Sequence, residues 1–113
     1  MSREYKLYID DILRSIEKIE NYTKNMSYED FIKSDMSIDA VIRNLEIIGE
    51  ASKKIPIDIK KRYSEVEWSK ITGLRDILIH EYFGVNSKIL WDVIANKIPK
   101  LKISIKKMSE ELR

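Results

Sequence analysis

Residues 37–48 read SIDAVIRNLEII and show a pattern that recurs through most of the chain. Their apolar side chains return every three or four residues, which is the spacing of one face of an α-helix: Ile38, Val41, Ile42, Leu45 and Ile48. Ser37 is a favourable N-cap residue. Residues 55–58, Ile-Pro-Ile-Asp, break the pattern, because proline donates no backbone N–H and restricts the residue before it. We therefore predict a helix that begins after Ser37 and ends before Pro56.

The same spacing extends in both directions from this helix. A first helix is predicted upstream, weakening at residues 21–25, and a short amphipathic piece follows around Phe31. The first helix has one apolar stripe, which consists of Tyr5, Ile9, Ile12, Ile16 and Ile19. Downstream, one helix is predicted from near Trp68 to about Phe83, where Gly84 supplies a stop. A last helix is predicted from Ser87 to Met108, with a kink at Pro99. The chain is thus expected to be all-α, an antiparallel bundle of four to five helices forming a single domain over residues 1–113.

The composition narrows the class of protein. With 113 residues, 43% of them hydrophobic and 35% charged, the chain is long enough for one hydrophobic core. The net charge of +2 does not establish a polyanionic partner. Lysines recur over residues 53–62 and 97–107. We interpret them as parts of solvent-exposed helix faces; the alternative is a basic groove. The absence of cysteine excludes a disulfide framework, and no apolar run approaches the length of a membrane span, so we expect a cytoplasmic protein without a membrane partner.

The one histidine of the chain, His80, lies in the stretch RDILIHEY at residues 75–82. Histidine is the side chain that titrates near neutral pH, and Arg75 adds a permanent cation nearby. On a helical wheel, Gly73 and His80 fall on nearly the opposite side from the apolar face, which consists of Trp68, Ile71, Leu74, Leu78 and Tyr82. Asp76, four residues before His80, can hydrogen-bond to the imidazole and orient it. The plain alternative is a solvent-exposed histidine.

The wheel separates Arg75 from His80 by about 140°. The two side chains can meet only through the length of the arginine, a distortion of the helix, or a second copy of the protein. A two-fold homodimer that pairs this face with itself would place two Arg75 and two His80 side chains around one cleft. Gly73, on the same face, would let another backbone come close.

These residues resemble a known family. Four residues separate Arg75 from His80, and one residue separates His80 from Tyr82. This spacing resembles the Arg-x4-His-x-Tyr signature of the HEPN superfamily, and of its HepT-like toxins in particular. Four further features are similar to that family: residues 41–51, the residues from Trp68 to Leu74 that lead into the signature, the Tyr82-Phe83 pair and Trp91. The likeness covers most of the chain.

The resemblance implies a HEPN-like bundle and a metal-independent endoribonuclease that acts as a toxin, usually as a homodimer with both signatures facing one cleft. It implies that Arg75 and His80 are catalytic and act on an RNA substrate. It also implies a cognate minimal nucleotidyltransferase as antitoxin, which silences the toxin by adding AMP to Tyr82. No cofactor or metal is implied, and with one histidine and no cysteine we expect no metal site.

The residue types suit that chemistry. RNA cleavage without a metal uses the neighbouring 2′-hydroxyl as nucleophile, and a histidine near neutral pKa can take its proton or protonate the leaving oxygen. A guanidinium can hold two phosphate oxygens as charge develops. Asp76 would fix the imidazole tautomer, or is a plain surface acid. The resemblance makes Tyr82 the acceptor of AMP. The alternative is that Tyr82 only packs against the core, because the helical wheel places it on the apolar face.

Two other classes of protein stay open. The chain could be a non-catalytic helical module that binds nucleotides or a nucleotidyltransferase, or a structural dimer whose signature residues merely pack. One helix face carries a row of charged residues, Arg43, Glu46 and Glu50. We expect them to form intrahelical salt bridges. The alternative is a role in the dimer or in holding the antitoxin.

Overall fold

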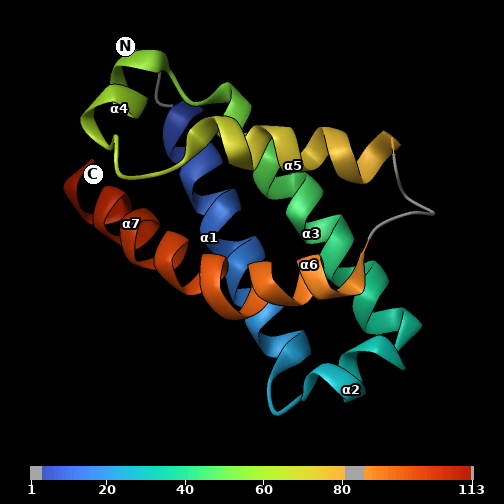
Figure 1. Ribbon diagram of the computed structural model, residues 1–113. Coiled ribbons are helices and arrows are strands. Elements are labelled where there is room, and N and C mark those ends of the chain that lie inside the picture. The colour runs from blue at the N-terminus through green and yellow to red at the C-terminus, as the bar shows by residue number, and fades with distance from the viewer. Residues whose placement is uncertain (1–3, 81–85, 113) are drawn as a thin grey trace.

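The computed structural model describes residues 4–80 and 86–112, and for residues 75–80 it describes the path of the helix but not the side chains (Figure 1). The elements in chain order are α1 (Glu4–Thr23), α2 (Tyr28–Ile32), α3 (Asp35–Lys54), α4 (Ile57–Arg62), α5 (Trp68–His80), α6 (Ser87–Asp92), the π-helical turn η2 (Val93–Lys97) and α7 (Ile98–Glu111). No strand occurs among the described residues. The all-α prediction is confirmed.

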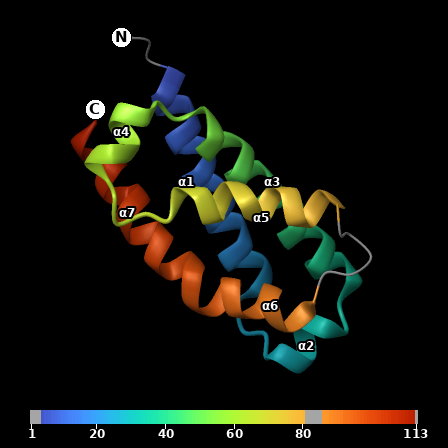
Figure 2. The ribbon, with the colours of Figure 1, turned by 45° about the horizontal axis from the view of Figure 1, so that its top comes forward.

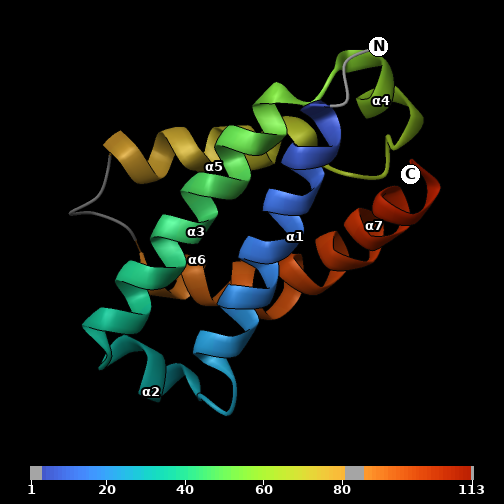
Figure 3. The ribbon, with the colours of Figure 1, turned by 180° about the vertical axis from the view of Figure 1, so that it is seen from behind.

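The two longest helices, α1 and α3, lie side by side and run in opposite directions (Figures 1 and 3). α5 packs on α3 and crosses it at an angle, as Figure 2 shows from above. α7 packs on α1, where Lys102 Nζ lies 2.7 Å from Glu20 Oε1. Hydrogen bonding to Glu20 raises the pKa of Lys102. None of the helices in the described part of the chain is long and apolar enough to cross a membrane.

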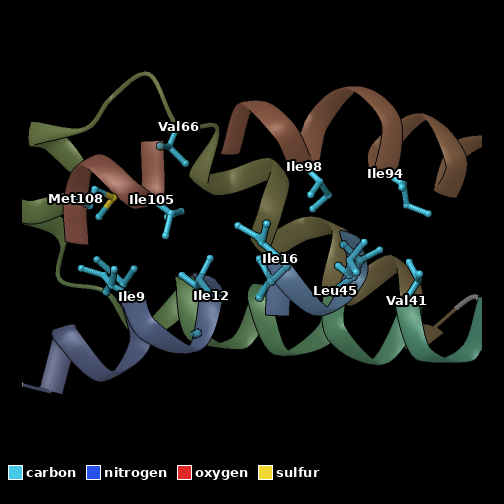
Figure 4. Close-up of a cluster of buried hydrophobic side chains, with 14 of the residues drawn as sticks. Ile9, Ile12, Ile16, Val41, Leu45, Val66, Ile94, Ile98, Ile105 and Met108 are labelled. Atoms are coloured by element: carbon cyan, nitrogen blue, oxygen red, sulfur yellow. The ribbon is translucent and has the colours of Figure 1, made fainter. Parts of the chain in front are cut away.

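The core is built mainly from isoleucine, contributed by α1, α3 and the last helical segments (Figure 4). The apolar stripe predicted for the first helix is buried as expected, at Ile9, Ile12, Ile16 and Ile19. Full burial of each such side chain is worth about 1.5–3 kcal/mol relative to leaving it in water. This burial, rather than helix propensity alone, holds α1 against α3 and α7.

The start of α3 corrects one prediction. The helix begins at Asp35 and its N-cap is Ser34, whose Oγ accepts a hydrogen bond from the backbone N–H of Ser37 at 3.2 Å. Ser37, predicted as the cap, is buried inside the first turn. Two serines three residues apart offer equivalent caps. Ser34 is the one used because its N–H already closes a turn onto Phe31 at 3.1 Å, and Asp35 then stands in the first turn, where a carboxylate is favourable.

The short helix α4 was missed by the sequence pattern, which marked residues 55–58 only as a break. Pro56 does end the preceding helix, but it then serves as the N-cap of α4. Ile59 anchors this helix with 1% of its surface exposed, whereas Ile57 is 68% exposed. Six residues make less than two turns, so the periodicity that marks the longer helices is too short to be recognised here.

The predicted kink at Pro99 takes the form of a widened turn. In η2 the N–H of Ile98 reaches back five residues to the carbonyl of Val93. Proline has no N–H to offer Ala95, and in a regular α-helix its ring would crowd that carbonyl. The wider turn gives the ring room and then lets α7 continue. The predicted last helix is therefore three segments, α6, η2 and α7, and it starts at Ser87 as expected, capped by Asn86.

Candidate active site

The helix α5 carries three of the four predicted site residues. Its backbone is helical from Trp68 to His80, so Arg75, Asp76 and His80 occupy one continuous helix, as predicted. Their side chains are not described, and Tyr82 lies outside the described residues altogether. The catalytic functions of Arg75 and His80, the supporting function of Asp76 and the modification of Tyr82 therefore stay predictions.

The beginning of α5 is fixed by the segment before it. Trp68 Nε1 donates a hydrogen bond to the carbonyl oxygen of Tyr63 at 3.1 Å, and the backbone N–H of Trp68 donates one to the carbonyl oxygen of Val66 at 2.9 Å. Lys60 Nζ stands 5.9 Å from the centre of the Trp68 ring. Partial burial lowers the pKa of this lysine. These contacts hold the first turn of the helix that leads to Arg75.

The apolar face predicted for α5 is found in its first half. Trp68, Ile71 and Leu74 are partly buried and pack against the core. On the other side, a Cβ added to Gly73 would meet no described atom within 4 Å. The helical-wheel prediction is thus confirmed for residues 68–74, while Leu78 falls in the stretch without described side chains. None of the described residues fills the space beside Gly73.

Residues 41–51, which resemble the same family, lie in α3, the helix that packs against α5. Val41, Leu45 and Ile48 are buried there. Of the predicted salt-bridge row, Arg43 is exposed and Glu50 contacts Lys54, with 3.7 Å between Oε1 and Nζ. The two parts of the sequence that carry the resemblance are therefore packed together.

Charged groups surround the first turn of α5. Glu67 Oε2 lies 2.6 Å from Lys70 Nζ. This hydrogen bond, and then the charges of Lys70, Lys97 and Lys100, lower the pKa of Glu67, while the same hydrogen bond raises the pKa of Lys70. Among the residues with described side chains, no three His, Cys, Asp or Glu gather closely enough to hold a metal ion.

Comparison with known proteins places the chain in a family. A family model described as "Ribonuclease HepT-like" matches residues 12–108. A Methanocaldococcus jannaschii protein named "Gamma-glutamylcyclotransferase and putative RNase" is 46% identical over 112 residues, which make up 99% of this chain and 50% of that protein. A Thermococcus cleftensis protein named "Probable ribonuclease HepT" is 45% identical over 108 residues, covering 96% of this chain and 98% of that one.

A third relative, from Caldanaerobacter subterraneus and named "Putative RNase", is 42% identical over 104 residues, covering 92% of this chain and 93% of that one. The chain thus spans half the length of the first relative and nearly all of the other two. No solved structure matches it significantly. The family match covers most of the sequence, and the chain belongs to the HepT-like ribonuclease family.

Proposed function

We propose that this chain is an endoribonuclease that cleaves RNA without a metal ion and acts in the cytoplasm as the toxin of a toxin–antitoxin pair. The observation that carries the proposal is that Arg75 and His80 lie on one continuous helix, α5, whose first half packs on the core. Membership of a family described as ribonucleases, with relatives that carry the same word in their names, supports the reaction class.

The reaction would use two copies of the chain. One His80 takes the proton of the 2′-hydroxyl, the 2′-oxygen attacks phosphorus, and the bond from phosphorus to the 5′-oxygen breaks. The second His80, from the other copy, gives its proton to the leaving 5′-oxygen. Proton transfer of this kind contributes roughly 10²–10⁴-fold to the rate. Arg75 would hold the non-bridging oxygens with its planar fork, where a lysine would offer only a point charge.

The open surface beside Gly73 supports the homodimer that this division of labour needs. A helical glycine with no described atom near its Cβ position leaves room for another backbone. Since each chain contains a single histidine, one site with both an acid and a base of this type requires two chains. Asp76, one turn before His80, would fix the imidazole tautomer.

Neutralisation would act on Tyr82 through a nucleotidyltransferase partner. An AMP group on this residue would place a phosphate and a bulky base two residues from His80, repelling RNA and blocking its approach. Tyr82→Phe should therefore stay toxic when the partner is co-expressed. Full neutralisation of that variant would mean that the partner inhibits by binding alone.

The test of the proposed activity is incubation of purified protein with RNA in the presence of EDTA. We expect fragments with 2′,3′-cyclic phosphate and 5′-hydroxyl ends, and no cleavage of DNA, which lacks the 2′-hydroxyl. His80→Ala should abolish cleavage with unchanged helix content by circular dichroism, and Arg75→Lys should be nearly inactive. Equal cleavage by the His80→Ala variant would refute the assignment, and no cleavage by the wild-type chain would favour a non-catalytic binding module.

A further inference from the structure

A pocket of about 300 Å³ opens between α5 and the last helical segments. Its walls are aliphatic and come from α3, α5 and α7: Leu45, Ile48, Ile71, Leu74, Ile98 and Leu101. Leu45, Ile98 and Val66, which also lines the pocket, can be located in Figure 4. This volume is at the lower end of the range for small-molecule sites, roughly 300–1,000 Å³. Because aliphatic walls offer water few hydrogen bonds, the space favours an apolar occupant.

The pocket follows from the way the helices are arranged. Within the described residues, α5 packs on α3 and α7 packs on α1, while α5 and α7 make no extensive contact with each other. The π-helical turn η2 borders the space, since its first and last residues, Val93 and Lys97, both line it. Single π-helical turns are rare and occur frequently at functional sites. Pro99 accounts for the break in the helix, and the break sets Lys97 at the pocket.

Some of the charged side chains that line the pocket form ion pairs with each other, and others do not. Three lysines and two glutamates line it, and Lys70 is held by Glu67 at 2.6 Å. Lys97 and Lys100 approach closely enough for their charges to lower the pKa of Glu67. Neither of these two lysines forms an ion pair with any residue whose side chain is described. The pocket therefore combines an aliphatic interior with two cationic groups that are available to a ligand and one further carboxylate, that of Glu65.

We propose that this pocket binds a small organic anion with an aliphatic body, whose carboxylate or phosphate head group is held by Lys97 and Lys100. The body would lie against Ile71 and Leu74, and a charged acceptor suits the two free ammonium groups. The proposal rests on the pocket alone and holds whether or not the chain cleaves RNA.

Two other occupants fit the pocket less well. A nucleobase from RNA is normally stacked on an aromatic ring, and none of the residues found to line the pocket is aromatic. An amphipathic helix from a protein partner needs a row of anchoring sites spaced by three, four and seven residues along a groove, and this is one short pocket. A single-tailed small anion matches both the volume and the charge.

The test uses decanoate as the probe with the full chain, measured by isothermal titration calorimetry and by amide chemical-shift changes in NMR. We expect saturable binding, with shifts centred on Ile71, Val93 and Leu101. The double variant Lys97→Gln/Lys100→Gln should weaken binding about tenfold or more. The matched control is Lys106→Gln/Lys107→Gln on α7, the helix that also carries Lys100, because these exposed lysines do not line the pocket. It should bind like the wild type.

Two further arms make the result decisive. Uncharged decan-1-ol should bind more weakly than decanoate, and Ser104→Phe, which fills the pocket, should remove binding from a chain that keeps its helix content. Equal losses in the two lysine double variants would overturn the proposal, as would shifts away from the pocket or no binding at roughly millimolar probe. Displacement of decanoate by a short RNA would assign the pocket to nucleic acid and would also overturn it.

Discussion

The phenol oxygen of Tyr63 lies 2.6 Å from Oε1 of Glu111, and this hydrogen bond joins two residues that are 48 positions apart. Tyr63 follows α4 directly and is 3% exposed, while Glu111 is the last residue of α7. The carbonyl of Tyr63 also accepts the indole N–H of Trp68. One residue thus connects the end of the chain to the start of the helix that carries Arg75 and His80.

Tyr63→Phe removes the hydroxyl and keeps the buried ring. A hydrogen bond to a charged acceptor contributes about 1.5–3 kcal/mol to stability, so the variant should lose about that much free energy of unfolding in urea denaturation. Tyr22→Phe is the matched control, since the Tyr22 side chain is exposed on α1. An equal and negligible loss in both variants would mean that the bond to Glu111 contributes nothing.

The same hydrogen bond should make stability depend on pH in the alkaline range. Burial, then the hydrogen bond to Glu111 and its charge, raises the pKa of Tyr63 above the ordinary value of 10.0. The folded state therefore favours the neutral phenol. Its contribution is fully present below the unfolded pKa and is lost as pH rises through the folded one.

We therefore expect the stability difference between wild type and Tyr63→Phe to be constant from neutral pH up to about pH 9 and to shrink above the ordinary tyrosine pKa of about 10. The measurement is urea denaturation of both proteins across that range. Taking the difference removes the alkaline effects of other groups that the two proteins share. A difference that grew with pH would show that the ionised phenol is the favoured form.

The isoleucine core provides a matched pair of substitutions. Ile16 is fully buried and Ile103 is 71% exposed on α7. Ile16→Ala should cost about 2–5 kcal/mol of unfolding free energy, because it leaves a cavity as well as removing apolar contact. Ile103→Ala should stay within about 0.5 kcal/mol of the wild type. Similar losses at the two positions would place Ile103 against an apolar partner surface in solution.

Gly73 tests the face proposed for the dimer. Gly73→Ala should stabilise the subunit by about 0.5–1 kcal/mol, because alanine favours the helix and its Cβ meets nothing within 4 Å. Gly73→Arg adds bulk and charge to the same face and should shift the protein toward monomer in sedimentation analysis. Asn21→Arg, an exposed position on α1, is the control and should leave the mass unchanged. An intact dimer in Gly73→Arg would place the interface elsewhere.

The long helices could be predicted because their information is local. In α1 and α3 an apolar side chain returns every three or four residues through 20 residues, and burial of that stripe is a consequence of its spacing. The start of α3 could not be fixed in the same way, because Ser34 and Ser37 are both able to cap it. α4 is too short to show a period, and its position depends on Ile59 and Tyr63 reaching a core built from other parts of the chain.

The features around α5 divide in the same manner. The open side at Gly73 and the packed side at Ile71 follow from the helical wheel of that segment alone. The pocket does not, because its walls come from α3, α5 and α7, which are far apart in the sequence. Lys97 and Lys100 look like members of a solvated lysine face until α5 is placed opposite them. Pro99 predicts that the regular helix is interrupted, because its nitrogen carries no hydrogen to donate. It does not predict whether the helix kinks or forms a wide turn such as η2.

If two copies of His80 and Arg75 act on one RNA phosphodiester, cleavage must depend on how wild-type and mutant chains combine into dimers. Wild-type and His80→Ala chains are exchanged through mild denaturant at fixed total concentration, and RNA cleavage in EDTA is measured against the wild-type fraction. If each site needs both histidines, an equal mixture should retain about a quarter of the wild-type rate, the share of dimers with two wild-type chains. A rate of about half, falling in proportion to the wild-type fraction, would show that a single His80 suffices for cleavage and would refute the two-histidine site.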